Sequence, residues 1–458
     1  MDKVVARLQA MQQENLEKLY GLLRIPSISA DPDFKNQVLV CADRVSELFV
    51  EAGLDDVRLL RSKGYPAVYG EKKLNPDWPT VLVYGHYDVQ PPDPLELWST
   101  EPFEPTVRDG KIFARGASDD KGQFFMHVAA VAAMIDQKVL PCNVKFLIEG
   151  EEEVGSVHLA DIVEGNRELL AADTILVSDT AMVANDVPSI TTGVRGMAYL
   201  EVTVTGPNRD LHSGMYGGAV VNPINALCQM VASLHDDQGR VAVPGFYQNV
   251  LDMSQAERES YTEVPFDELA YCQELGVDSL GGESGFSPLE RIGARPTLDV
   301  NGIWGGYTGE GAKTVIASEA RAKISMRLVP NQSAEEITHL FEAHFRRLAI
   351  PGTQVDVQYL HGGEPGLMPL DSKAYRAASQ AYAKTFEKEP LPLRCGGSIP
   401  LVSLFKEKLG LDTTMMGFGL DSDAIHSPDE SFGLFNFHRG TETIPWFYHF
   451  FAQSMQAR

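Results

Sequence analysis

Carboxylate and imidazole side chains recur along this chain at the points where apolar runs end. The groups in such positions are His86, Asp88, Asp119, Asp120, Glu151 to Glu153, Asp179 and His426. A surface tolerates single carboxylates anywhere, whereas groups that follow several buried strands converge at one edge of a sheet. Imidazole and carboxylate are ligands of divalent metals. The pattern therefore predicts a site for two divalent cations.

The apolar runs themselves read as short buried strands. They occupy residues 80–84, 143–148, 174–177 and 413–418. Because they alternate with helical stretches, they predict an α/β domain with a mostly parallel, doubly wound sheet and helices on both faces. Ligands bind beyond the carboxyl ends of the strands in open sheets of this kind, and all of the groups named above lie at that end.

Composition limits the partners and the compartment. The chain has 458 residues, of which 44% are hydrophobic, so two or three globular domains are expected. Lysine plus arginine (39) against aspartate plus glutamate (63) gives a net charge of −24, which argues against nucleic acid or an anionic membrane as a partner. Neither the polar amphipathic start at residues 1–20 nor any other window could span a bilayer. Five cysteines without Cys-x-x-Cys spacing indicate reduced thiols, so we expect a cytoplasmic protein without a thiolate metal site.

The character of the chain changes near residues 193–196. Alternating, strand-like runs follow at residues 198–204, 320–328 and 354–360, with helical segments at 223–234 and 333–348. We expect a smaller antiparallel α+β domain inserted into the first domain. The predicted divisions are residues 1–195, 196–366 and 367–458. His426 follows the insertion, so the metal site would belong to one discontinuous domain.

Several motifs carry a family resemblance. They are GHYDVQP (85–91), RGASDDKG (115–122), EGEEEVGS (149–156), RDLHSG (209–214), GAKT (311–314), RLVPN (327–331), GGSIP (396–400) and HS (426–427). Together they resemble the di-metal exopeptidase family of carnosinases, cytosolic non-specific dipeptidases, aminoacylases and desuccinylases, and most closely its dipeptidase and carnosinase branch. The resemblance implies the same two-domain arrangement, with the insertion serving as a lid and dimerisation domain.

The resemblance also implies two ligands for each of two metals and one further ligand shared between them. It assigns His86 and Asp179 to one metal, Glu153 and His426 to the other, and Asp119 to a bridging position, with Asp88 supporting His86. Zn²⁺ is the expected ion, and Mn²⁺ or Co²⁺ are alternatives. Other interpretations remain open from the residues alone. His86 and Asp88 could be a strand-end histidine with a solvated carboxylate, Asp120 could cap a helix, and Glu151 is expected to be exposed without a role.

Three consecutive carboxylates after a buried strand repel one another unless a dication neutralises them. The family pattern makes Glu152 the general base. Hydrolysis would then use a metal-bridging water with a lowered pKa. Glu152 would take a proton from this water and later pass it to the departing amine.

The inserted region carries a second set of implied site residues. His212 resembles a histidine that reaches from the partner subunit to stabilise the oxyanion, although a plain surface histidine is the alternative. The positions implied around the substrate's terminal carboxylate and peptide oxygen are Arg327, Thr314, His361, Gly397 and Ser398. Arginine suits a carboxylate because its planar fork forms two hydrogen bonds, whereas Thr314 could equally be a strand-face hydroxyl. The remaining histidines singled out, His127, His158, His235, His339, His344 and His438, are expected to be structural.

These residues predict a di-metal hydrolase, expected to be a homodimer, that cleaves dipeptides or very short peptides with a free carboxyl end. A deacylase or desuccinylase acting on N-acyl amino acids is the alternative, and a non-catalytic metal-binding relic is disfavoured by the intact Glu152. No Gly-x-Ser-x-Gly elbow supports a serine hydrolase, and the glycines of residues 302–311 lack the setting of a phosphate loop. One departure stands out: Cys395 replaces a glutamate that dipeptidase relatives tend to have, which predicts tolerance of N-acylated substrates. The alternative is that Cys395 only fills space and that Asp179 or another carboxylate receives the substrate's amine.

Overall fold

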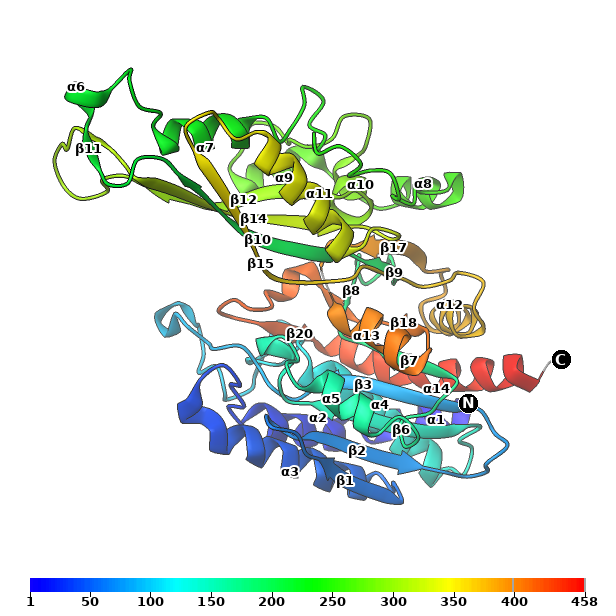
Figure 1. Cartoon of the computed structure of the whole chain (residues 1–458). Helices are drawn as coiled ribbons and strands as arrows, with labels where there is room; N and C mark the ends of the chain where they lie inside the picture. Colours follow the sequence, from blue (N-terminus) through cyan, green and yellow to red (C-terminus); the bar gives the residue numbers. More distant parts are fainter. Residues whose placement is uncertain (398, 457–458) are drawn as a thin grey trace. The chain divides into compact units, whose positions relative to one another are not determined.

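The computed structural model describes residues 1–397 and 399–456 and divides into two compact units. Unit 1 comprises Met1–Thr192, Met368–Leu393 and Leu404–Arg458, and unit 2 comprises Gly193–Leu367 and Arg394–Ser403. The colours of Figure 1 follow this division, because unit 1 contains the blue start and the red end of the chain and unit 2 contains its green and yellow middle. The short segment Arg394–Ser403 belongs to unit 2, whereas the predicted division placed these residues in the last segment of the first domain, 367–458.

Unit 1 contains most of the helices. They are α1 (Asp2–Ala10), α2 (Gln12–Leu23), α3 (Lys35–Glu51), α4 (Lys121–Asp136), α5 (Leu159–Gly165), α12 (Lys373–Phe386), α13 (Pro400–Leu409), which starts within the segment assigned to unit 2, and α14 (Leu434–Gln456). The strands are β1 (Asp56–Leu60), β2 (Ala67–Lys72), β3 (Thr80–His86), β4 (Thr106–Arg108), β5 (Lys111–Phe113), β6 (Asn143–Glu149), β7 (Thr174–Val177), β8 (Ala181–Met182), β9 (Ser189–Val194), β17 (Leu391–Cys395), β18 (Thr413–Met415), β19 (Gly419–Leu420) and β20 (Ser431–Gly433). The predicted N-terminal helix is thus two helices separated at Met11.

The main sheet of unit 1 runs in the order β1-β2-β6-β3-β7-β18-β9. Its four central strands, β6, β3, β7 and β18, are parallel, and the strands outside them pair antiparallel. The predicted parallel sheet is therefore confirmed for its centre. The β1–β2 pair is antiparallel because a short turn joins its strands, whereas β3, β6 and β7 are joined by crossovers that contain α4 and α5.

Both faces of the central strands are covered by helices. In β3, Gly85 lies so close to α4 that an added Cβ would stand 2.8 Å from the Cβ of Phe124. Tyr84, which precedes it and therefore points to the other face, contacts the ring of Phe405 on α13 at 5.3 Å between centroids. This arrangement confirms the doubly wound layers and explains why these strands read as continuous apolar runs.

Helix α4 is buried over most of its circumference. It packs against β3 on one side and against α1, α2 and α14 on the other, and Phe125 stacks on Phe437 of α14 at 6.4 Å. Such a helix has little freedom to shift. Its N-terminus therefore fixes the position of Asp119 and Asp120, the two residues immediately before it.

Unit 2 is built on a four-stranded antiparallel sheet in the order β12-β14-β10-β15. Its strands are β10 (Gly196–Thr205), β11 (Leu211–His212), β12 (Thr297–Gly305), β13 (Val315–Ile316), β14 (Glu319–Leu328), β15 (Gln354–Gly363) and β16 (Gly366–Leu367). Its helices are α6 (Ser213–Tyr216), α7 (Pro223–Ala232), α8 (Gln255–Thr262), α9 (Glu268–Leu275), α10 (Pro288–Ala294) and α11 (Ala334–Arg347). Helices α7 and α11 bury one face of the sheet. The inserted α+β fold is confirmed, and β12 is an additional strand.

Two further expectations concern the chain as a whole. None of the five cysteines, all of which lie within the described residues, forms a disulfide bond. Within the described residues, no helix combines the length and the apolar character that crossing a membrane would require.

Candidate metal centre

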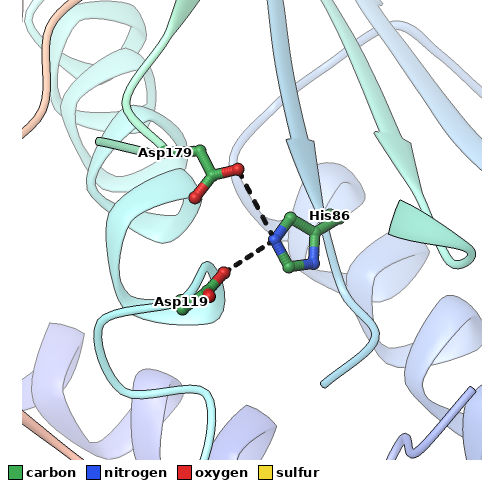
Figure 2. Close-up of side chains that lie close together, drawn as sticks. All are labelled: His86, Asp119 and Asp179. Atoms are coloured by element: carbon green, nitrogen blue, oxygen red, sulfur yellow. Dashed lines mark hydrogen bonds and ion pairs between the residues drawn. The ribbon is translucent and has the colours of Figure 1, made fainter. Parts of the chain in front are cut away.

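The carboxyl ends of three parallel strands meet at one edge of the unit 1 sheet. The register pairs His86 at the end of β3 with Glu149 at the end of β6, and Tyr84 with Val177 at the end of β7. The side chains that follow these strands are therefore brought together, as predicted from the apolar runs. Figure 2 shows the first group of side chains brought together in this way, in which Asp119 and Asp179 both point toward the ring of His86.

The first group of candidate ligands surrounds the ring of His86. Its Nε2 lies 2.9 Å from Oδ1 of Asp119 and 3.7 Å from Oδ2 of Asp179. Ligands of a tetrahedral Zn²⁺, at ~2.0–2.1 Å from the ion, stand about 3.3 Å apart. The separations bracket this value, so the three side chains can close on one small cation with minor adjustment.

The second group shares Asp119 with the first. Nε2 of His426 lies 2.9 Å from Oδ2 of Asp119 and 3.2 Å from Oε2 of Glu153. Each carboxylate oxygen of Asp119 thus faces a different histidine, which is the geometry of a carboxylate bridging two ions. The candidate ligand atoms of each group lie within 4.8 Å of one another. All five predicted metal ligands are therefore brought together in unit 1, in the two predicted groups.

Asp88 is fully buried and contacts a residue of each group, His86 and Glu153. Its carboxylate accepts hydrogen bonds from Ser29 Oγ at 2.6 Å and from the backbone N–H groups of Glu152 and Glu153 at 3.3 and 3.2 Å. Nδ1 of His86 lies 3.1 Å from the backbone oxygen of Asp88. The alternative of a solvated carboxylate is therefore wrong, because Asp88 holds both the histidine and the turn that carries Glu152.

Electrostatics in this cluster indicate a deficit of positive charge. Burial, together with the charges of Asp119 and Asp120, raises the pKa of Asp179 well above its ordinary value. Burial raises the pKa of Glu152 to about 7, a change that His86 opposes and Glu153 supports. Carboxylates that resist ionisation because other carboxylates crowd them are stabilised by dications. The residues present therefore fit two divalent metal ions.

Two acidic neighbours of the ligands differ from expectation. Asp120 occupies the N-cap position of α4 without a capping hydrogen bond, and its Oδ2 accepts instead from the backbone N–H of His86 at 3.1 Å. Glu151, expected to be exposed, is buried and lies 2.9 Å from Nδ1 of His158. The turn after β6 places the Glu151 carboxylate against Gly64. A Cβ added to Gly64 would lie only 1.9 Å from Oε1 of Glu151.

Other residues around the site were missed. Glu430, fully buried, accepts hydrogen bonds from Arg115 at 2.8 Å and from the N–H of Asp119 at 3.1 Å. Gln90 donates to Oε2 of Glu153 at 2.8 Å. Gln123 links the carbonyl of Ser118 to the N–H of Phe418. Proximity to the motifs at residues 85–91 and 426–427 was the only available signal for Gln90 and Glu430, and residue type alone gave none.

In unit 2, His212 at the end of β11 and Thr314 immediately before β13 are both exposed and lie close together, because β11 and β13 pair. The N–H of Ser213 donates to the carbonyl of Thr314 at 3.1 Å. Nδ1 of His212 accepts from the N–H of Gly214 at 3.0 Å. A neutral imidazole that accepts at Nδ1 carries its proton on Nε2, so His212 presents an N–H donor to the solvent.

Arg327 and His361 lie elsewhere in unit 2. Arg327 on β14 is opposite Met197, and His361 on β15 is opposite Tyr199, whose ring it contacts at 5.1 Å. Met197 and Tyr199 share one face of β10, so both predicted residues lie on that face of the sheet. The carbonyl of Gly397 accepts from the N–H of Arg195 at 3.0 Å. Ser398 lies outside the described residues.

Unit 2 does not bring these two sets together. His212 and Thr314 lie beyond the Glu319 end of β14, and Arg327 lies at the other end of this strand. An extended strand from Glu319 to Arg327 measures about 26 Å. Figure 1 shows β11 and α6 at one extremity of the unit 2 sheet. One copy of unit 2 therefore cannot place His212 beside Arg327.

Comparison with known proteins gives consistent matches over nearly the whole chain. The model of peptidase family M20/M25/M40 matches residues 82–445. The human Beta-Ala-His dipeptidase is 31% identical over 99% of this chain and 93% of the relative. The Cys-Gly metallodipeptidase dug1 of Schizosaccharomyces pombe is 31% identical over 98% of both.

Solved structures agree with these sequence matches. The structure of human carnosine dipeptidase 1 has a TM-score of 0.79 at 30% identity and covers 99% of this chain and 98% of that one. The M20 family metallo-carboxypeptidase Sso-CP2 of Sulfolobus solfataricus has a TM-score of 0.83 at 31% identity, covering 96% of this chain and 99% of that one.

Proposed function

Because the chain belongs to peptidase family M20/M25/M40, we propose that it is a di-metal hydrolase that cleaves dipeptides or very short peptides at a free carboxyl end. Similar relatives are named as dipeptidases for Cys-Gly and Beta-Ala-His. The observation that carries the proposal is Asp119, whose two carboxylate oxygens each face a histidine from a different part of the chain. A cytoplasmic location, which five cysteines without a disulfide bond favour, belongs to the same proposal.

His86 and Asp179 would hold one divalent cation, Glu153 and His426 the other, and Asp119 both. Bound there, the cations would polarise the scissile carbonyl and lower the pKa of the attacking water. Zn²⁺ is the expected ion because imidazole and carboxylate are common zinc ligands. The same ligands accept Mn²⁺ and Co²⁺.

Glu152 is the proposed general base. Its carboxylate stands among the ligands without belonging to either group of candidate ligands. A group with a pKa near neutrality can both accept and release a proton at physiological pH. Glu152 takes a proton from the attacking water and delivers it to the nitrogen of the departing amine. Asp88 orients this step, because its carboxylate accepts from the backbone N–H of Glu152 and its own backbone carbonyl lies 3.1 Å from Nδ1 of His86.

The unit 2 residues bind the substrate in this proposal. Arg327 pairs with the terminal carboxylate through its planar fork, and His361, Gly397 and Ser398 would surround the carboxylate and the peptide oxygen. Thr314 lies beside His212, so it would join the site together with His212. His212 donates its Nε2–H to the oxyanion. Since about 26 Å of β14 separates His212 from Arg327, His212 comes from the partner subunit, and the working enzyme is a homodimer.

Replacement of Glu152 by Gln tests the base. Both cations should stay bound, because Glu152 is not a ligand, while kcat should fall by at least roughly 10²–10⁴-fold. Glu153→Gln is the matched control and should instead reduce metal content. Metal analysis and dipeptide hydrolysis are measured on the same samples. A metal-loaded Glu152→Gln protein with near-normal kcat would remove Glu152 from this role.

Mixed dimers test the sharing of sites between subunits. His212→Ala and Glu152→Gln proteins should each be nearly inactive alone. After subunit exchange, a mixed dimer should regain up to one site that combines both intact residues. If verified mixed dimers stay inactive, His212 does not act across the subunits.

A deacylase acting on N-acyl amino acids is the second candidate. It is favoured by Cys395, whose Sγ accepts from the N–H of Gly397 at 3.3 Å and which stands where the family resemblance implies a glutamate. A neutral acyl group avoids placing an ammonium ion without its carboxylate partner. Comparing kcat/KM for matched free and N-acetylated dipeptides, in the natural protein and in Cys395→Glu, decides between them. Equal rejection of the acetylated series by both proteins would exclude this candidate.

A further inference from the structure

A second arginine lies beside Arg327 at the end of the unit 2 sheet. Arg195 immediately precedes Gly196, the first residue of β10, and Gly196 pairs with Leu328, the neighbour of Arg327. Adjacent strands lie about 4.8 Å apart. The backbones of the two arginines are therefore neighbours across the β10–β14 pair.

Hydrogen bonds hold the backbone N–H and the Nε of Arg195 and leave the two terminal nitrogens of its guanidinium group available. Its Nε donates to the carbonyl of Gly396 at 2.8 Å, and its backbone N–H donates to the carbonyl of Gly397 at 3.0 Å. Within residues 1–397 and 399–456, no hydrogen bond or ion pair engages the two terminal nitrogens of this half-buried side chain. A guanidinium fixed through Nε presents these nitrogens as a preorganised fork.

The charge around Arg195 is unusual in a chain with a net charge of −24. Burial and the nearby charge of Arg327 lower the pKa of Arg195 to about 10. The carboxylate that opposes this change is Asp299, an exposed residue of β12 that also accepts from Thr297 Oγ1 at 3.1 Å. Two half-buried guanidinium groups that repel each other are stabilised when an anion binds between them.

We propose that Arg195 and Arg327 together form a subsite for a C-terminal residue with two carboxylates, so that the enzyme favours dipeptides ending in aspartate or glutamate. Arg327 takes the terminal carboxylate, and Arg195 takes the carboxylate of the side chain. The inference rests on the proposed function, in which Arg327 binds the substrate's carboxyl end. It adds a substrate class, dipeptides with an acidic C-terminal residue, which the relatives' names, Cys-Gly and Beta-Ala-His dipeptidase, do not include.

The test compares Ala-Glu with Ala-Gln, two dipeptides that differ in charge at nearly constant shape. The natural protein, loaded with metal, should show a kcat/KM at least tenfold higher for Ala-Glu, since hydrogen bonds between charged groups are the strong ones. Arg195→Gln should reduce this ratio to within about twofold of unity, because the charge is gone. Arg195→Lys should retain part of the preference, because it keeps the charge and loses the fork.

Two controls keep the test decisive if Arg195→Gln disturbs its loop. Asp299→Asn, which removes the opposing carboxylate, should raise the preference for Ala-Glu. Added salt should lower this preference in the natural protein, because a partly exposed ion pair is screened.

The outcomes separate this inference from the proposed function. A natural protein that hydrolyses both dipeptides equally, or a preference that survives Arg195→Gln, overturns the subsite alone. A metal-loaded natural protein that hydrolyses neither these nor other neutral dipeptides overturns the proposed function.

Discussion

Replacing Glu430 with Gln should weaken both the fold and metal binding, although Glu430 belongs to neither group of candidate ligands. One of its oxygens accepts from Arg115 at 2.8 Å and from the N–H of Gly116 at 2.9 Å. The other accepts from the N–H groups of Ser118 at 3.0 Å and Asp119 at 3.1 Å. Glu430 thereby holds the loop that presents Asp119 to both histidines.

The magnitude follows from these four bonds. In Gln, one oxygen becomes an NH₂ group that cannot accept, so two donors in the buried cluster lose their partner. The charge of Arg115 also loses its counter-ion, and both side chains are 1% exposed. Breaking a buried pair of this kind costs about 3–5 kcal/mol.

Urea unfolding of the metal-free protein measures this free energy, and calorimetric titration with Zn²⁺ measures the affinity. The matched control is Glu104→Gln, which removes an exposed pair with Arg24 at 2.8 Å and should cost ~0–1 kcal/mol. The reasoning fails if Glu430→Gln is as stable as the control and binds two cations with unchanged affinity.

Three further changes are predicted. In the metal-free protein, hydrogen bonds to Asp119 and Glu153 raise the pKa of His426 from 6.5 to about 10, and burial raises that of Glu152 from 4.5 to about 7. Because each folded-state pKa lies above the ordinary one, the stability of the metal-free protein declines as the pH rises between the two pKa values of each group. The gain in Tm on adding Zn²⁺ should therefore grow from pH 6 to 9. A gain that stays constant over this range would contradict the roles given to His426 and Glu152. Ser29→Ala removes the 2.6 Å bond to buried Asp88 and should lower the free energy of unfolding by about 1–3 kcal/mol; an unchanged urea midpoint would exclude this. Gly85→Ala would place a Cβ 2.5 Å from Oδ2 of Asp120 and should cost about 1–3 kcal/mol by overpacking, measured as a lower Tm.

The fold was predictable where both faces of a strand are buried. Every residue of β6 is buried, as expected of a parallel strand between two helical layers, so its sequence is mainly apolar. Lys145 interrupts the run and donates its ammonium to the carbonyls of Leu169 and Ala171. Strand β12 escaped prediction because most of its side chains are at least partly exposed, which leaves no alternation to read.

Strand ends alone mark some of the ligands, whereas Asp119, which precedes α4, was assigned its bridging position through the family resemblance. His86 and Asp179 are ligands that strand ends mark. Glu430 is different, because its partners are mainly backbone N–H groups of a loop more than three hundred positions earlier in the chain, and no residue type marks such a contact. Glu151 was misjudged because a run of three acidic residues suggests one solvated face, whereas the turn after β6 gives each residue a different environment.

The position of β18 has a consequence for synthesis on the ribosome. Residues Thr413–Met415 fill the place between β7 and β9, two strands that are complete by Val194. Until the last tenth of the chain emerges, both neighbours have edges with unsatisfied hydrogen-bonding groups, which are prone to pair with other chains. The same late segment carries His426 and Glu430. A nascent or truncated chain would therefore lack a closed sheet and would hold only the group of His86, Asp119 and Asp179, without the second group, which needs His426.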